Sequence, residues 1–162
     1  MSEHVLQEII SRLKKSKCYS ISLDSTPDEG HIDQLTLVIR YMEDTLPKER
    51  FLTFMDNRGH NGSDMATALF QFLEGHNIDL RDCRGQSYDN AGNMSGKYKG
   101  MQALIKDKNP LSEFVPCFRH SLNLVGNAAV NTCSAAIHYF DFVQQVYLFF
   151  TASTALYAML KE

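Results

Sequence analysis

The order in which strand-like and helical hydrophobic patterns follow one another is the strongest constraint on the fold of this chain. Residues 4–15 place apolar side chains at helical spacing, with two lysines at the end where the helix dipole favours positive charge. Segments rich in β-branched and aromatic residues follow at 18–26, 34–42 and 49–56. The short connection over 43–48 suits a hairpin, so we expect the second and third strands to be antiparallel.

The second part of the chain alternates between helix and strand. A helix is expected over 64–75, capped by Ser63 or Asp64 and ended by Gly75. The order is completed by a weak strand at 83–89, a basic helix across 97–107, a short strand at 113–117 and helices from 118 onward, interrupted around 131–134. A three-strand meander followed by helix–strand–helix–strand predicts an α/β fold with a mixed sheet and helices on both faces. This is the order of the ribonuclease H-like fold, here with extra C-terminal helices.

Charge and cysteine content narrow the classes of function. A net charge of −3 and an isoelectric point near 6.1 exclude a protein that binds nucleic acid through bulk positive charge. Any contact with DNA therefore needs a local patch or a metal ion. The four cysteines have irregular spacing and do not make a disulfide framework in a chain of 162 residues. Together with a polar start that shows no secretory signal, this favours a reducing compartment, the nucleus or the cytoplasm.

Charged residues are almost missing from the last part of the chain. Within residues 120–160 the only Asp, Glu, Lys or Arg is Asp141. Residues 142–160 carry no formal charge and raise the possibility of a membrane helix, but Gln144 and Gln145 favour a helix buried in a bundle. Helices of this composition expose apolar faces unless something covers them. We therefore expect self-association or a protein partner through these helices.

Two aspartates stand at the ends of strands that the predicted order places side by side. Asp24 ends the first strand and Asp89 ends the fourth, so their carboxylates would face one pocket. Hard oxygen ligands of this kind suit Mg²⁺ or Mn²⁺. Two such ions flanking a phosphodiester stabilise the attacking and leaving oxygens of an in-line displacement. The alternative is that both are turn formers, because each precedes Ser or Asn at a strand exit, where Asp is common.

Two cysteines and two histidines after residue 116 match in number the four ligands of a zinc site. Cys117 and His120 are separated by two residues, and Cys133 and His138 by four. Residues five positions apart do not share a helical face, whereas a zinc site needs four ligands that converge tetrahedrally. The favoured interpretation is that Cys117 and Cys133 are small buried hydrophobic residues.

Four lysines cluster after the glycine-rich segment that follows Asp89. Lys97, Lys99, Lys106 and Lys108 would lie on the predicted basic helix, next to the candidate acidic site. Such a helix either follows the backbone of DNA, with Lys97, Lys99 and Lys106 as the contacts, or is a solvated helix face.

Three runs of sequence carry a family resemblance. ISLDSTPD and HIDQLTLVIRYM lie within 21–42, GQSYDNAGNMSGKYKGMQALI spans 85–105, and FVPCFRHSLNLV spans 114–125. In this order they resemble the hAT superfamily of DNA transposases, and within it the transposase-like domain that accompanies MYM-type and TTF-type zinc fingers. The resemblance covers most of residues 15–130. It implies metal-dependent cleavage and strand transfer of DNA, with Mg²⁺ or Mn²⁺ as the cofactor.

The resemblance assigns roles to particular residues. Asp24 corresponds to the first catalytic acid and Asp89 to the second, and both would bind the metal. Cys117 and His120 match a C-x-x-H element, in which His120 would orient or contact the scissile phosphate. The alternative for His120 is a histidine held by hydrogen bonds at a strand–helix junction. The third acid of the family, a glutamate, lies on a helix beyond a long helical insertion, and Glu162 stands in the wrong element for that role.

The missing third acid determines the expected activity. Catalytic groups that act as a unit lose most of their rate when one is removed, so we expect no cleavage by this chain alone. The expected domains are an N-terminal helix (1–16), a truncated ribonuclease H-like core (17–133) and the helical start of an insertion domain (134–162). The expected function is that of a catalytic-core fragment of a hAT-type, transposase-derived protein. The alternative is a non-enzymatic interaction or dimerisation domain that uses its apolar C-terminal helices.

Overall fold

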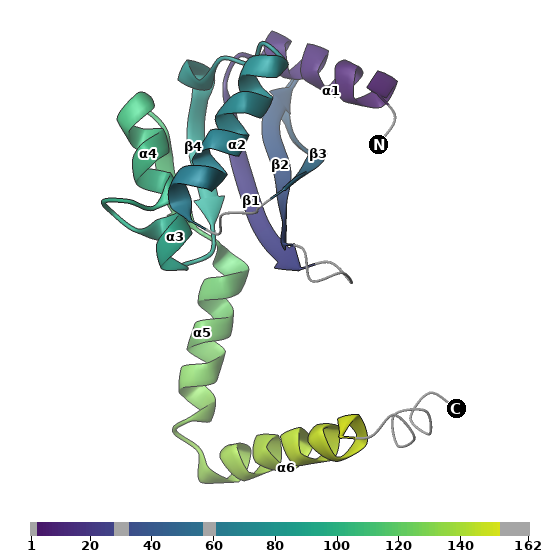
Figure 1. Ribbon diagram of the computed structural model, residues 1–162, viewed down its shortest axis with the longest axis vertical. Coiled ribbons are helices and arrows are strands. Elements are labelled where there is room, and N and C mark those ends of the chain that lie inside the picture. The colour runs from purple at the N-terminus through teal and green to yellow at the C-terminus, as the bar shows by residue number, and fades with distance from the viewer. Residues whose placement is uncertain (1–2, 28–32, 57–60, 153–162) are drawn as a thin grey trace. The chain divides into compact units, whose positions relative to one another are not determined.

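A five-stranded mixed sheet forms the centre of the first of two units, Met1–His120 and Ser121–Glu162. The computed structural model describes residues 3–27, 33–56 and 61–152 (Figure 1). The first unit contains, in order, α1 (Glu3–Ser16), β1 (Tyr19–Pro27), β2 (Asp33–Glu43), β3 (Leu46–Asp56), α2 (Gly62–Gly75), η1 (Leu80–Asp82), β4 (Cys83–Tyr88), α3 (Gly92–Ser95), α4 (Met101–Lys108) and β5 (Glu113–Pro116). Helix α5 (Phe118–Val130) begins at the end of this unit, and α6 (Ser134–Thr151) belongs to the second.

The strands are arranged in the order β3-β2-β1-β4-β5. β1 pairs with β2, and β2 with β3, in antiparallel fashion, whereas β1, β4 and β5 are parallel neighbours. The β2–β3 hairpin turns through Asp44 and Thr45, and Asp44 has a positive φ of 56°, a conformation that Asp tolerates. The mixed sheet confirms the predicted fold class, and it confirms that the strands of Asp24 and Asp89 are neighbours.

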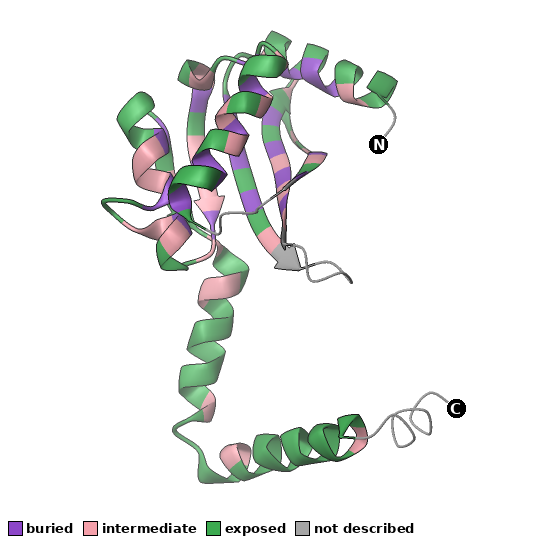
Figure 2. Cartoon of the chain, viewed as in Figure 1, coloured by how far each residue is buried: buried purple, intermediate pink, exposed green. Residues whose placement is uncertain are grey.

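One face of the sheet carries the hydrophobic core. Along β1 the buried residues Tyr19, Ile21 and Leu23 alternate with less buried polar ones, as expected for a strand with one covered face (Figure 2). Helices α1, α2 and α4 supply the covering side chains, among them Leu13, Leu69 and Ile105. These side chains are at most 2% exposed, so the core is closed on this side.

The opposite face of the sheet is open within the first unit. Its side chains are mainly small or polar, including Ser20, Ser22, Thr36, Gly85 and Ser87, and none of these is classed as buried. The expectation of helices on both faces is therefore met on one face only in this unit. The physical reason is the composition of this face, because serine, threonine and glycine offer little apolar surface to a covering helix.

Helix α2 begins and ends at residues that the sequence only partly identified. Its cap is Asn61, whose Oδ1 accepts a hydrogen bond of 2.9 Å from the Asp64 amide, so the prediction of Ser63 or Asp64 is wrong. The helix starts earlier because Gly62 fits tightly against other backbone, where a Cβ would lie 2.6 Å from the Lys99 carbonyl oxygen. The predicted end at Gly75 is confirmed.

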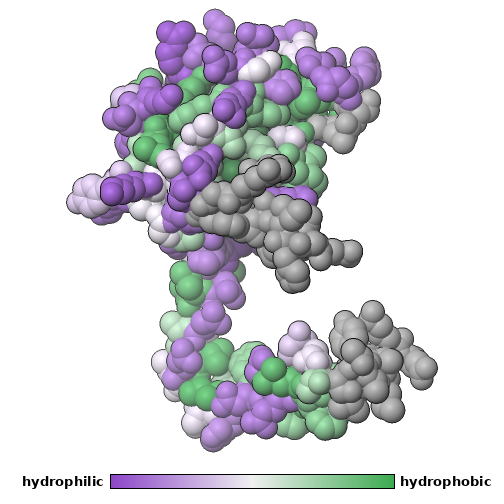
Figure 3. Space-filling view, in the orientation of Figure 1, coloured by the Kyte–Doolittle hydropathy of each residue, from purple (hydrophilic) through white to green (hydrophobic). Residues whose placement is uncertain are grey.

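The second unit exposes the apolar side chains that its lack of charge predicts. Neither α5 nor α6 contains a buried residue, so the interpretation of 142–160 as a buried bundle helix is not met in the described part, which stops at residue 152 (Figure 2). Hydrophobic side chains gather over both helices (Figure 3). Cys133 is exposed, which corrects its assignment as a buried hydrophobic residue, because it lies in the turn that precedes α6. Among the described residues, none of the helices has both the length and the hydropathy to span a bilayer.

Candidate functional site

The two candidate acids lie on neighbouring parallel strands. Asp24 is an exposed residue of β1, and Asp89 is the half-buried first residue after β4. The prediction that Asp24 ends its strand is wrong, because β1 stays paired with β2 as far as Pro27. The last pair between β1 and β4 joins Ser22 to Ser87. Asp24 and Asp89 each lie two residues beyond this last pair.

Each acid follows a buried residue. Leu23 and Tyr88, which precede them, are 3% and 1% exposed. Because successive side chains of a strand point to opposite faces, the Asp24 carboxylate points away from the core, whereas Asp89 lies one residue past the end of β4 and is half-buried. Neighbouring strands lie about 4.8 Å apart, so carboxylates at matching positions can reach one cation.

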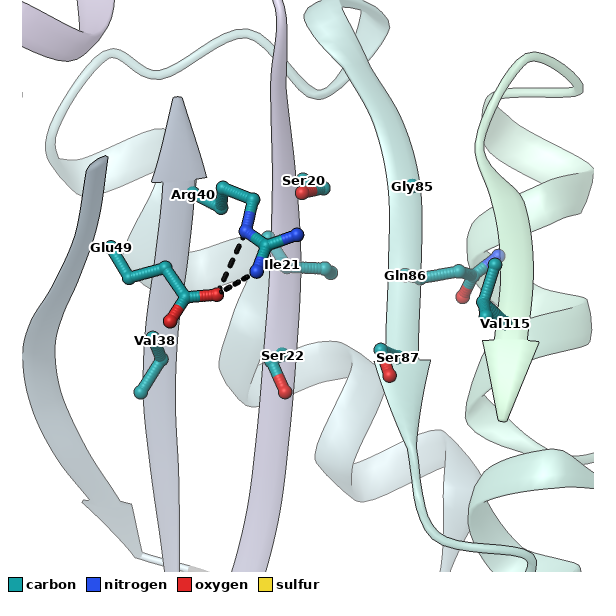
Figure 4. Close-up of a pocket in the computed structure, with 10 residues that line it drawn as sticks. All are labelled: Ser20, Ile21, Ser22, Val38, Arg40, Glu49, Gly85, Gln86, Ser87 and Val115. Carbon is teal, nitrogen blue, oxygen red and sulfur yellow. Dashed lines mark hydrogen bonds and ion pairs between the residues drawn. The ribbon is translucent and has the colours of Figure 1, made fainter. Parts of the chain in front are cut away.

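A pocket of about 310 Å³ lies along β1 and β4, and its lining ends at Ser22 and Ser87, so that it includes neither Asp24 nor Asp89. Its floor includes Ser20, Ser22, Gly85 and Ser87, which come from these two strands (Figure 4). On the β2–β3 side, Arg40 Nε donates a 2.7 Å hydrogen bond to the Glu49 carboxylate. The small side chains leave the strand backbone accessible to a ligand, while the arginine charge is already neutralised.

Asp89 also shapes the turn that leaves β4. The Ala91 amide donates a 3.0 Å hydrogen bond to Asp89 Oδ1, and Ala91 is the N-cap of α3. The turn-forming role is therefore real for Asp89. It does not exclude a ligand role, because an ionised carboxylate has about four acceptor positions and this bond uses one.

Cys117 and His120 follow the third parallel strand. β5 pairs with β4 up to Tyr88 and Pro116, and the Cys117 amide donates a 2.8 Å hydrogen bond to the Tyr88 carbonyl oxygen. Cys117 is therefore the β5 counterpart of Asp89. His120 is half-buried in the first turn of α5, at the strand–helix junction.

The donor set of this edge fits a single hydrated ion better than a closed cage. Among residues 3–27, 33–56 and 61–152 no three His, Cys, Asp or Glu side chains come close enough to form a metal-binding group. Asp24 and Asp89 offer hard oxygen atoms, which match Mg²⁺ or Mn²⁺ ions that keep several of their waters. Glu162 lies outside the described residues.

The lysines do not form the predicted basic helix. Lys97 and Lys99 lie in a turn between α3 and α4, so the start of the helix at residue 97 is wrong; α4 begins at Met101. The reason is that Gly96 and Gly100 close this turn through a backbone hydrogen bond. Lys106 is in α4 and pairs with Glu113 at 2.8 Å, so a phosphate would have to compete with that carboxylate.

A buried polar network under β4 was not expected from the sequence. Gln86 and Tyr88 are each 1% exposed, and the Tyr88 hydroxyl donates to Gln86 Oε1. Burial is the main cause that raises the pKa of the Tyr88 phenol and of the Cys83 thiol above their ordinary values. The only signal in the sequence was a glutamine at an inward position of a strand, which alone does not identify its partners.

Comparison with known families agrees with this architecture. The sequence profile of the DUF4371 family, described as "ZMYM1/FAM200, RNase-like domain", matches residues 1–100, which is more than half of the chain. The chain belongs to this family. The description RNase-like agrees with the observed mixed sheet and its ribonuclease H-like strand order. The matched region of this ZMYM1/FAM200 RNase-like domain includes Asp24 and Asp89 and ends before Cys117 and His120.

Proposed function

We propose that this ZMYM1/FAM200 RNase-like domain is part of a hAT-type, transposase-derived protein of the nucleus or cytoplasm that binds Mg²⁺ or Mn²⁺ between Asp24 and Asp89. The ancestral reaction is metal-dependent cleavage and strand transfer of DNA. One observation supports the proposal, the parallel register of β1 and β4, whose last pair joins Ser22 to Ser87, two residues before each acid. A bound ion would supply positive charge to a phosphodiester. The two carboxylates would hold that ion, and His120 would contact the phosphate.

The same arrangement leads us to expect no DNA cleavage by this chain alone. Two carboxylates leave one side of the ion to water, and the described residues offer no third acid nearby. In-line displacement with two ions needs ligands that fix both of them. We therefore expect metal binding without turnover. Nicking of duplex DNA by the purified chain in Mn²⁺ would contradict this expectation.

Metal binding is tested by thermal unfolding of the purified chain during a Mn²⁺ titration. At a metal concentration ten times the dissociation constant, binding to the folded state alone adds about 1.4 kcal/mol, which is about 5 °C for a unit of this size. Asp89→Asn should abolish the shift. Asp107→Asn, which removes an exposed carboxylate of α4, is the matched control and should leave it unchanged. A wild-type chain that shows no shift at millimolar Mn²⁺ would refute the site and leave the fold unaffected.

A second candidate function is self-association through the second unit, because its helices carry many large hydrophobic side chains in contact with solvent. Those at least 53% exposed are Leu122, Val125, Tyr139, Phe140, Phe142, Tyr147, Leu148 and Phe149. We propose that a second copy of this chain covers them, since Asp141 is the single formal charge within residues 121–152 that could oppose such contact. Sedimentation velocity should detect a dimer that Phe142→Glu dissociates and the control Gln145→Glu does not. A monomer at all concentrations would exclude this function.

A further inference from the structure

The segment GKYKG, residues 96–100, forms a closed loop between α3 and α4. The Gly100 amide donates a 3.1 Å hydrogen bond to the Gly96 carbonyl oxygen, which brings the two ends of the loop together. A Cβ on Gly100 would lie 2.6 Å from that oxygen, so the closure depends on glycine. Gln102 Nε2 donates to the Ser95 carbonyl oxygen at 2.6 Å and ties α4 to the residue before the loop.

The start of α2 supports the same loop from the core side. A Cβ on Gly62 would lie 2.6 Å from the Lys99 carbonyl oxygen and 2.8 Å from the Met101 nitrogen. Helix and loop backbones are therefore in direct contact. A loop that is closed at its base and packed against a helix presents its tip with little conformational freedom.

The tip of this loop is an aromatic ring between two positive charges. Tyr98 is 91% exposed, the largest exposed fraction among the large hydrophobic and aromatic side chains of the described residues. Lys97 and Lys99 are exposed, and within the described part of the chain neither forms an ion pair. In contrast, Lys106 pairs with Glu113, and Lys108 lies 4.2 Å from the centre of the Phe70 ring. Of these four lysines, the two at the loop tip are therefore the more available to an external anion.

The loop lies close in sequence to the candidate metal site. The N-cap of α3, Ala91, lies two residues after Asp89, and this four-residue helix leads directly to Gly96. A helix of four residues rises only about 6 Å, so one short rigid element connects the acid to the loop. In Figure 1 the connection between α3 and α4 projects from the side of the sheet on which β4 lies.

We propose that Tyr98 is a stacking platform for an unpaired base of DNA, with Lys97 and Lys99 contacting the phosphates on either side of that base. This inference rests on the proposed function, which makes DNA the substrate. An exposed aromatic ring flanked by cations combines the two interactions by which single strands are bound, base stacking and phosphate contact. The faces of paired bases inside a duplex are covered by their neighbours, so the platform selects single-stranded or unpaired DNA.

The test measures binding of a fluorescein-labelled single-stranded oligonucleotide and of a blunt duplex by fluorescence anisotropy, in EDTA so that metal plays no part. Tyr98→Ala should weaken single-strand binding roughly tenfold, the usual effect of removing one stacked base. Tyr98→Phe keeps the ring and should bind like the wild type. Leu111→Ala, which removes an exposed large side chain elsewhere in the first unit, is the control and should bind like the wild type. Because Tyr98 and Leu111 are both exposed, these variants should retain the wild-type unfolding temperature.

The lysine contribution is measured through the salt dependence of binding. Changing both Lys97 and Lys99 to Gln should reduce the slope of log K against log salt by about 1.4, since each phosphate contact to a single strand contributes about 0.7. The proposal is overturned if Tyr98→Ala binds the single strand as tightly as the wild type, if it loses equal affinity for the duplex, or if the wild type binds no single strand. The Mn²⁺ titration described above contains no DNA, so a failure of the metal site is seen separately from a failure of the stacking platform.

Discussion

The buried hydrogen bond between Tyr88 and Gln86 offers a sharp test of how β4 is held in place. The Tyr88 hydroxyl donates to Gln86 Oε1, and both side chains are 1% exposed. Gln86 Nε2 donates in turn to two carbonyl oxygens, of Gln102 in α4 at 3.2 Å and of Ser112 before β5 at 3.1 Å. One amide group therefore connects β4 to α4 and to the segment that precedes β5.

Tyr88→Phe removes one hydroxyl and leaves Gln86 Oε1 buried without that donor. A buried acceptor left unsatisfied costs about 1–3 kcal/mol, so we expect the free energy of unfolding to fall by about 2 kcal/mol. For a unit of about this size the unfolding temperature should fall by roughly 8 °C. Tyr98→Phe makes the same chemical change at an exposed position and should have almost no effect.

A double-mutant cycle separates the hydrogen bond from general packing. Gln86→Leu removes the acceptor, so in that background the Tyr88 hydroxyl is itself unsatisfied and Tyr88→Phe should be neutral or stabilising. Urea unfolding of the four proteins, followed by circular dichroism, gives the coupling energy, which we expect near 2 kcal/mol. Equal effects of Tyr88→Phe in both backgrounds, or a loss below about 0.5 kcal/mol in the wild type, would refute the reasoning.

Two further predictions concern stability. Burial raises the pKa of Tyr19 and Tyr88 above the ordinary value of 10.0. Since each phenol has a higher pKa in the folded than in the unfolded state, the contribution of these tyrosines to the free energy of unfolding is complete below about pH 10 and is lost as the pH rises beyond it. The urea midpoint should therefore fall above about pH 10, and less steeply in Tyr88→Phe. A midpoint unchanged well above pH 10 would contradict this. Asn61→Ala should lower the free energy of unfolding by about 1 kcal/mol through loss of the α2 cap, and Asn61→Ser, which keeps an oxygen acceptor at the cap, should lower it less; equal urea midpoints for the two variants would argue against the cap.

The element order was predictable because the hydrophobic period changes clearly along this chain. Alternation over 18–26 and 34–42 reflects one covered face of the sheet, and the apolar spacing of 4–15 reflects the side of α1 that packs on it. The neighbouring positions of β1 and β4 followed from topology alone. Helix boundaries were less predictable, since the cap at Asn61 depends on the close contact between Gly62 and the loop before α4.

The start of α4 was wrong for a reason that lies in tertiary structure. Lysines are good helix formers, so Lys97 and Lys99 extended the predicted helix toward its N-terminus. Instead, the backbone comes into close contact at Gly96 and Gly100, where side chains would keep the two segments apart. A pattern of charges shows neither this contact nor the role of the ring between the lysines. The same limit applies to Gln86, whose partners come from α4 and from the segment before β5.

The face on which Asp89 lies depends on a β-bulge that the sequence does not reveal. Tyr19 pairs with Cys83 and Ser20 with Gly85, so Arg84 is an extra residue in β4. Strict alternation from the buried Cys83 would place residue 89 on the covered face, away from Asp24. The bulge shifts the alternation by one residue, so that Gln86 and Tyr88 enter the core and the residue after Tyr88 no longer falls in the phase of the covered face. The prediction of a shared pocket considered only strand adjacency, whereas the register that sets both acids two residues beyond the last β1–β4 pair depends on this one inserted residue. Any rearrangement that removes the shift while keeping the rest of β4 in place would separate the two carboxylates.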